Sequence, residues 1–174
     1  KRQVLVLGIG AIFFTTRDLY ASIGNVIIQE GDSLIERKIG EDVASEVDLD
    51  IFSYDTIRTA KSKTAIEFID TTRVDVTEHS KLVIDEFVYD PNKKTGKLSL
   101  KASLGTVRYA SGQIAKNNPT SIKITTPTAT IGVRGTDFSM TVDELGSSTI
   151  ILLPSCDTNG NCYVGEISVE SDEG

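Results

Sequence analysis

Hydrophobic and polar positions alternate with a period of two along much of the chain, which is typical of β-strands with one buried face. The clearest apolar pairs are Ile66 with Phe68, Val74 with Val76, and Leu82 with Ile84. These pairs recur at intervals of eight residues, and turn-forming residues at 70–72 and 78–80 separate them. Helical periodicity is weak and is confined to about 39–50. The pattern predicts an all-β fold in which short strands meet at tight corners, as in a sandwich or a β-solenoid.

The alternation continues around two polar loops at 89–97 and 111–121. After the first loop, Leu98, Leu100 and Ala102 alternate with Lys and Ser residues, so we expect a strand with one solvated face. The second loop is rich in Asn and contains a Gly. Its polar tip is interpreted as a solvated connection in preference to a contact surface.

The apolar positions change parity within TPTATIGVRGTDFSMTV, which spans residues 126–142. They are odd at Ala129, Ile131 and Val133, and even at Phe138, Met140 and Val142. A β-bulge or a sharp corner produces such a change, and Gly135 supplies the backbone freedom that it needs. Arg134 and Asp137 flank the glycine, where they could pair or bond to freed backbone groups. We therefore interpret Arg134, Gly135, Asp137 and Phe138 as a structural kink and expect no catalytic residues here, because no nearby His, second carboxylate or nucleophile with a base accompanies them.

Composition limits the chemistry further. The 174-residue chain has a net charge of -7 and a pI near 4.8, and its Lys and Arg residues are scattered. We therefore expect no nucleic-acid partner. With His79 as the single His and only two Cys residues, we expect no metal site and no cofactor. The adjacent pair His79 and Ser80 gives no oriented triad, so we expect no hydrolase activity.

Residues 1–21 form a segment of their own. Lys1 and Arg2 precede an apolar run from Val4 to Phe14, and small residues follow around Ala21. This arrangement matches a secretory signal peptide, although Arg17 and Asp18 occupy the expected cleavage region. A packing arm or buried strand is the alternative, and the run is too short for a helix that spans a bilayer.

The segment CDTNGNC, residues 156–162, has two interpretations of its own. A calcium loop is disfavoured because Cys162 and Ser168 stand where an EF-hand has Gly and Glu. A hairpin with a three-residue loop at 158–160 would place Cys156 opposite Cys162, near enough for a disulfide. Two reduced thiols are the alternative for a protein that assembles in a reducing cytosol.

Two motifs resemble the FecR-domain family. IKITTPTATIGVRGTDFSMTV resembles the family's Thr-Pro-x-Ala segment with Val-Arg-Gly-Thr-x-Phe, and residues 55–84 resemble its Asp-x-Val-x-Thr and Ser-x-Leu-x-Ile run. The resemblance covers about 22–153. It implies an all-β fold with a solenoid-like stack of short strands, to which we add a C-terminal hairpin and acidic tail over 154–174. Many family members form the envelope-exposed part of membrane-anchored regulators of iron uptake.

The stretches SKLVIDEFVYDP, RYASGQIAKNNP and GTDFSMTVDELG, with ILLPSC, are similar to FecR-domain proteins of tailed phages that infect marine cyanobacteria. Those proteins are regarded as virion structural components. The resemblance implies a non-enzymatic scaffold of a phage tail or surface appendage that contacts other virion proteins or copies of itself, as a homo-oligomer or within a larger assembly. The alternative is a secreted or periplasmic FecR-like sensor module that binds an envelope protein.

Overall fold

The structure, a computed structural model, describes residues 21–118, 120–156 and 159–171. Apart from Ala21, the segment predicted over 1–21 lies outside these residues. Within them, no helix has the length and apolar character that crossing a membrane requires.

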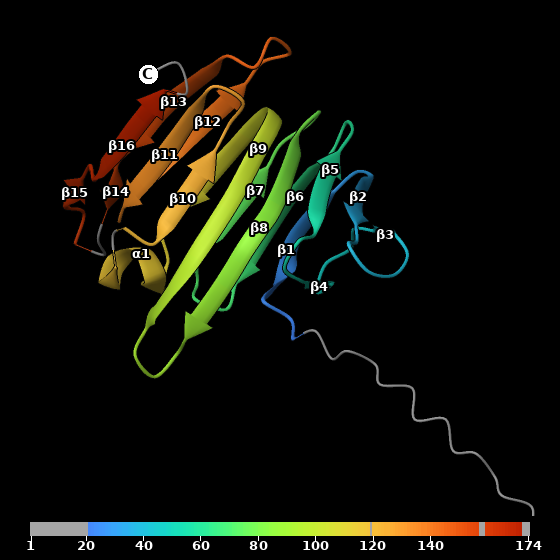
Figure 1. Ribbon diagram of the computed structural model, residues 1–174, viewed down its shortest axis with the longest axis horizontal. Coiled ribbons are helices and arrows are strands. Elements are labelled where there is room, and N and C mark those ends of the chain that lie inside the picture. The colour runs from blue at the N-terminus through green and yellow to red at the C-terminus, as the bar shows by residue number, and fades with distance from the viewer. Residues whose placement is uncertain (1–20, 119, 157–158, 172–174) are drawn as a thin grey trace, which may run out of the picture.

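Fourteen strands form one sheet that curls back on itself into two layers (Figure 1). The first layer contains, in spatial order, β4 (Asp50–Ile51), β1 (Gly24–Glu30), β6 (Lys63–Phe68), β7 (Arg73–Val76), the C-terminal half of β9 (Thr95–Ala110), β12 (Asp137–Val142) and β13 (Ser148–Leu153). The second layer contains β3 (Val43–Ala44), β2 (Ser33–Glu36), β5 (Thr56–Thr59), β8 (Lys81–Asp90), the N-terminal half of β9, β10 (Ile122–Thr125), β11 (Ala129–Arg134) and β16 (Glu166–Ser171). Among the strands of the described residues, all pairs are antiparallel except the parallel pair of β9 and β10.

Strand β9 belongs to both layers because it bends near Gly105. Its residues up to Leu104 pair with β8, whereas those from Gly105 onward pair with β12. Gly105 has φ +82°, and a Cβ at this position would lie 2.6 Å from Cα of Ser80. Only glycine combines this backbone conformation with so close an approach. The bend therefore allows one strand to hold the two layers together.

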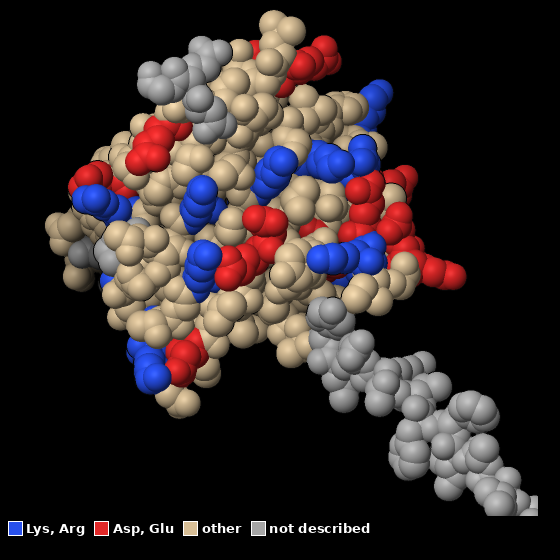
Figure 2. Space-filling view, in the orientation of Figure 1, with Lys and Arg blue, Asp and Glu red and all other residues tan. Residues whose placement is uncertain are grey.

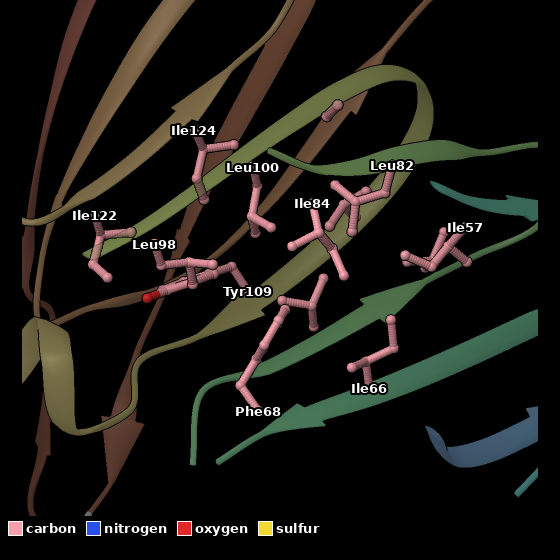
Figure 3. Close-up of a cluster of buried hydrophobic side chains, with 14 of the residues drawn as sticks. Ile57, Ile66, Phe68, Leu82, Ile84, Leu98, Leu100, Tyr109, Ile122 and Ile124 are labelled. Carbon is pink, nitrogen blue, oxygen red and sulfur yellow. The ribbon is translucent and has the colours of Figure 1, made fainter. Parts of the chain in front are cut away.

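The core lies between the layers. Figure 3 shows side chains of the second layer, including Ile84 and Leu100, directed toward Ile66, Phe68 and Tyr109 of the first. The apolar pairs that recur along 66–84 are all buried, at 2% exposure or less. Period-two alternation fits this architecture, since each layer has one face on the core.

The prediction of an all-β fold is confirmed, but a solenoid is not, because the layers are built from antiparallel pairs in a curled sheet. Residues 39–50 contain the short strand β3 and no helix. A short helix, α1 (Gln113–Asn117), lies instead in the loop predicted over 111–121, where Ile114 is buried. The acidic tail predicted within 154–174 contains β16, because Ile167 packs against the core while the strand pairs with β11.

The two layers end at two lateral sides. We call one the β3–β4 side and the other the β13–β16 side, after the outermost strand of each layer (Figure 1). Val43 and Leu49 are half-buried against the core at the first, and Ile150 and Ile167 at the second. Acidic side chains gather where β2 and β3 lie (Figure 2). The segment 41–50, which contains β3, has five acidic residues.

Candidate functional site

The kink predicted around Gly135 is the place where the chain passes from one layer to the other. Strand β11 ends at Arg134 in the second layer, and β12 begins at Asp137 in the first. Gly135 has φ +65°, a conformation that L side chains rarely adopt. Each layer has its own inward face, so the change of layer accounts for the change of parity. We call residues 134–138 the sheet crossing.

The two charged residues of the sheet crossing bind different groups. Arg134 Nη1 lies 3.1 Å from Glu166 Oε1 on β16, and both side chains are exposed. Asp137 Oδ1 accepts a hydrogen bond of 3.0 Å from the backbone N–H of Ser111, whose hydroxyl donates to the carbonyl of Thr136. Asp137 thus satisfies a freed backbone group, while the Arg134 pair fastens β16 to β11. An exposed ion pair of this kind contributes at most about 1 kcal/mol.

Phe138 is the apolar anchor of the crossing. Its ring is buried and stacks on Tyr109 of β9, with 5.3 Å between the centroids. Burial raises the pKa of the Tyr109 phenol, and contacts with Ser111 and Thr72 oppose this only in part. The Tyr109 phenol therefore stays protonated at physiological pH.

A buried carboxylate beside the crossing was missed by sequence reasoning, which assigned 70–72 to a turn. Asp70 is fully buried and accepts hydrogen bonds from the hydroxyl and N–H of Thr72, at 2.8 and 3.1 Å, and from the N–H of Ile114, at 3.2 Å. Its carbonyl accepts from the N–H of Gln113 at 2.8 Å. Asp70 therefore ties the turn between β6 and β7 to α1. No local signal could reveal the contact with α1, because Gln113 and Ile114 are more than 40 residues from Asp70.

The family model described as FecR protein matches residues 55–153. The chain belongs to the FecR family. The match runs from the start of β5 to the end of β13, so it contains the Gly105 bend, the Asp70 cluster and the sheet crossing. None of the curated proteins and none of the solved structures matches the chain.

A second buried charge cluster lies near the β3–β4 side, and of its residues only Asp55 falls within the segment that the FecR model matches. Arg37 pairs with Asp55, its guanidinium lies over the Phe52 ring, and it donates to the carbonyl of Asp50 at 2.8 Å. Burial raises the pKa of Asp55. The hydrogen bond from the backbone N–H of Phe52 and the positive charge and hydrogen bond of Arg37 counteract this only in part. The cluster joins β2 to the start of β5. All of its groups point at one another, so we interpret it as structural.

An open groove of about 840 Å³ runs between the β5–β8 pair and the turn after β12. It is lined by Arg58, His79 and Lys81, by Asp143, and by apolar residues such as Leu104. The hydroxyl of the neighbouring Ser80 donates to the carbonyls of Glu78 and Thr106 and accepts from the N–H of Thr106 at 3.0 Å. Ser80 is therefore committed to the β9 bend, and the groove offers no activated nucleophile within the described residues.

The cysteines belong to a small separate hairpin. Strands β14 (Ser155–Cys156) and β15 (Cys162–Tyr163) pair with Cys156 opposite Cys162, and the two residues form a disulfide. Gly160 has φ +82°. Asp157 and Thr158 of the predicted hairpin lie outside the described residues. In the described parts of the chain, no group of three or more His, Cys, Asp or Glu residues could hold a metal ion.

Proposed function

We propose that this FecR-family chain is a non-enzymatic structural component of a phage virion, in the tail or another surface appendage. There it presents a rigid β scaffold to neighbouring virion proteins or to copies of itself. The observation that carries the proposal is the structural use of the family's signature segment: Gly135 turns the chain between layers and Phe138 anchors the core, while Asp137, at the variable position between them, accepts a hydrogen bond from a backbone N–H.

Residues that serve the fold in this way leave function to the surface. The similarity of several stretches to phage FecR-domain proteins supports the virion as the place where that surface is used. Among the buried polar groups of the described residues, the hydroxyls of Ser45 and Tyr109 have no hydrogen-bond partner, whereas Asp70 and Thr72 are hydrogen-bonded to each other and Asp70 also accepts from the backbone of α1. A scaffold needs such internally satisfied polar groups, whereas an active site needs some that are directed at a substrate.

Quantitative mass spectrometry of purified particles tests the proposal. We expect this chain at a fixed copy number relative to the major capsid protein after gradient purification. Presence only in the host envelope fraction would overturn the virion role and favour the second candidate, a secreted or periplasmic FecR-like module that binds an envelope protein. Membership of the FecR family is the observation that favours that candidate.

A further inference from the structure

The sheet ends in four outermost strands, and β13 differs from the other three. Strands β3 and β4 have two residues each; β3 lies within the acidic segment 41–50, and β4 begins at its last residue. Strand β16 has six residues but carries Glu166 and Glu170. Strand β13 also has six residues, with the sequence STIILL and no charge. Short or charged edge strands resist pairing with another chain, whereas a long neutral one invites it.

Both faces of β13 carry exposed apolar side chains. Even-numbered residues lie opposite the buried Phe138, Met140 and Val142 of β12 and so share the core face. Leu152 belongs to this face but is 38% exposed, because no further strand follows β13 among the described residues. Ile151 lies on the other face, opposite Ser139, and is 59% exposed. A strand added beside β13 would cover both side chains.

We propose that β13 of a second copy of this chain occupies this edge, so that two molecules join antiparallel across a two-fold axis. The register follows from the pleat. Opposed residues must share a face, so the sum of their numbers must be even. Centring the axis on Ile151 places Ile151 opposite Ile151 and Leu152 opposite Ile150. Both exposed apolar side chains then gain an apolar neighbour, and Thr149 lies opposite Leu153.

Charge favours a second copy as the occupant. A protein with net charge -7 repels its own copy wherever acidic surfaces meet, and β13 offers a seam without charge. The acidic turn with Asp143 and Glu144 precedes β13, so antiparallel pairing sends the two turns to opposite ends of the seam. Six residues of strand span about 20 Å, which exceeds the screening length of about 8 Å at physiological salt.

The pairing rests on the proposed scaffold role and supplies one of its contacts. Sedimentation velocity of the full chain tests it over a range of concentrations. We expect a reversible dimer. Ile151→Lys and Ile151→Glu should each weaken it at least about tenfold, since each sets like charges face to face and removes apolar contact. Val88→Lys and Val88→Glu are matched controls, because Val88 on β8 is 57% exposed and lies away from the edge.

Mixing the Ile151→Lys and Ile151→Glu proteins tests the register. Opposite charges then face each other only if position 151 lies opposite itself, so we expect the mixture to form a dimer that neither variant forms alone. A wild-type monomer, a dimer unaffected by Ile151→Lys, or a mixture that stays monomeric would each overturn the proposal. A larger ring would overturn it too, because isologous pairing closes at two copies.

Two further measurements keep the outcomes separate. Circular dichroism melting checks that the Ile151 variants fold, and Thr149→Lys provides a second charged edge from a side chain that is already exposed. The chain found in particles but monomeric in solution defeats the pairing and leaves the virion role standing. A dimer sensitive to Ile151→Lys together with absence from particles defeats the virion role alone.

Discussion

The β3–β4 side and the β13–β16 side close the same core in different ways. Each places one half-buried apolar residue from each layer over the core's end, Val43 and Leu49 on one side and Ile150 and Ile167 on the other. The first side then stops in two-residue strands beside acidic residues, whereas the second stops in two six-residue strands, one of them uncharged. Core closure and edge protection are thus separate features, and only the first is shared by both sides.

The largest expected effect comes from Gly105→Ala, which should destabilise the β3–β4 side and the β13–β16 side together. Gly105→Ala forces a Cβ to within 2.6 Å of Ser80 Cα at a backbone φ of +82°, so the bend of β9 must shift. We expect the free energy of unfolding to fall by about 3 kcal/mol or more, with faster amide exchange on both sides. Gly40→Ala is the control, because its φ is +101° but no atom lies within 4 Å. Equal losses for the two variants in urea denaturation would contradict the steric account.

Gly135→Val should affect the two sides differently: it should destabilise the β13–β16 side and leave the β3–β4 side unchanged. Gly135 has φ +65°, and the nearest atom to a Cβ at this position is 3.9 Å away, so we expect backbone strain to cost about 1–3 kcal/mol. Amide exchange should accelerate in β12 and β13 and stay unchanged in β2 and β3. Arg134→Ala removes only an exposed ion pair and should cost less than about 1 kcal/mol. An unchanged melting temperature for Gly135→Val would be inconsistent with a strained crossing.

Loss of the disulfide should affect the β13–β16 side only. Closing a short loop contributes about 2 kcal/mol at most, so a variant with both Cys156→Ser and Cys162→Ser should keep its core and lose order around β14 and β15. Intact-mass measurement after alkylation without reductant checks the bond directly. Labelling of both cysteines in the native protein would show that they are free thiols.

The smallest expected effect is the pH dependence that Asp55, near the β3–β4 side, gives to the free energy of unfolding. Burial raises the pKa of Asp55 above its ordinary value of 3.8, so the folded state binds the proton more tightly than the unfolded state. Between the ordinary and the raised pKa, the Asp55 contribution to the free energy of unfolding therefore falls as pH rises. Asp55→Asn should abolish that contribution in denaturation series across mildly acidic pH. If the wild type instead became more stable relative to Asp55→Asn as the pH rises, the predicted direction would be wrong.

Sequence patterns predicted the local features of this fold well. Period-two alternation identified strands such as β6, β7 and β8, and the parity change located the sheet crossing, because both follow from which face of a strand is buried. The assignment of strands to layers was beyond such patterns, since β11 pairs with β16 across more than 30 residues. The alternation of Ile167 and Val169 was a usable signal for β16, but the surrounding acidic residues led to its assignment as a tail.

The Asp70 cluster shows where local reasoning ends. Asp-Thr-Thr is ordinary turn material, and the turn does form, but α1 covers it and makes the carboxylate a buried acceptor. Burial of this kind depends on a loop packing back from a distant part of the sequence. The disulfide could be anticipated as one of two alternatives only, because pairing geometry permits the bond while the redox environment decides it.

Strand β9 also governs how the domain responds to force. Its 16 residues contribute hydrogen bonds to both layers, so a pull on β8 reaches β7 and β12 through one continuous backbone. We expect the domain to yield in a single mechanical step when it is stretched between its two sides, and to transmit tension below that threshold with little extension.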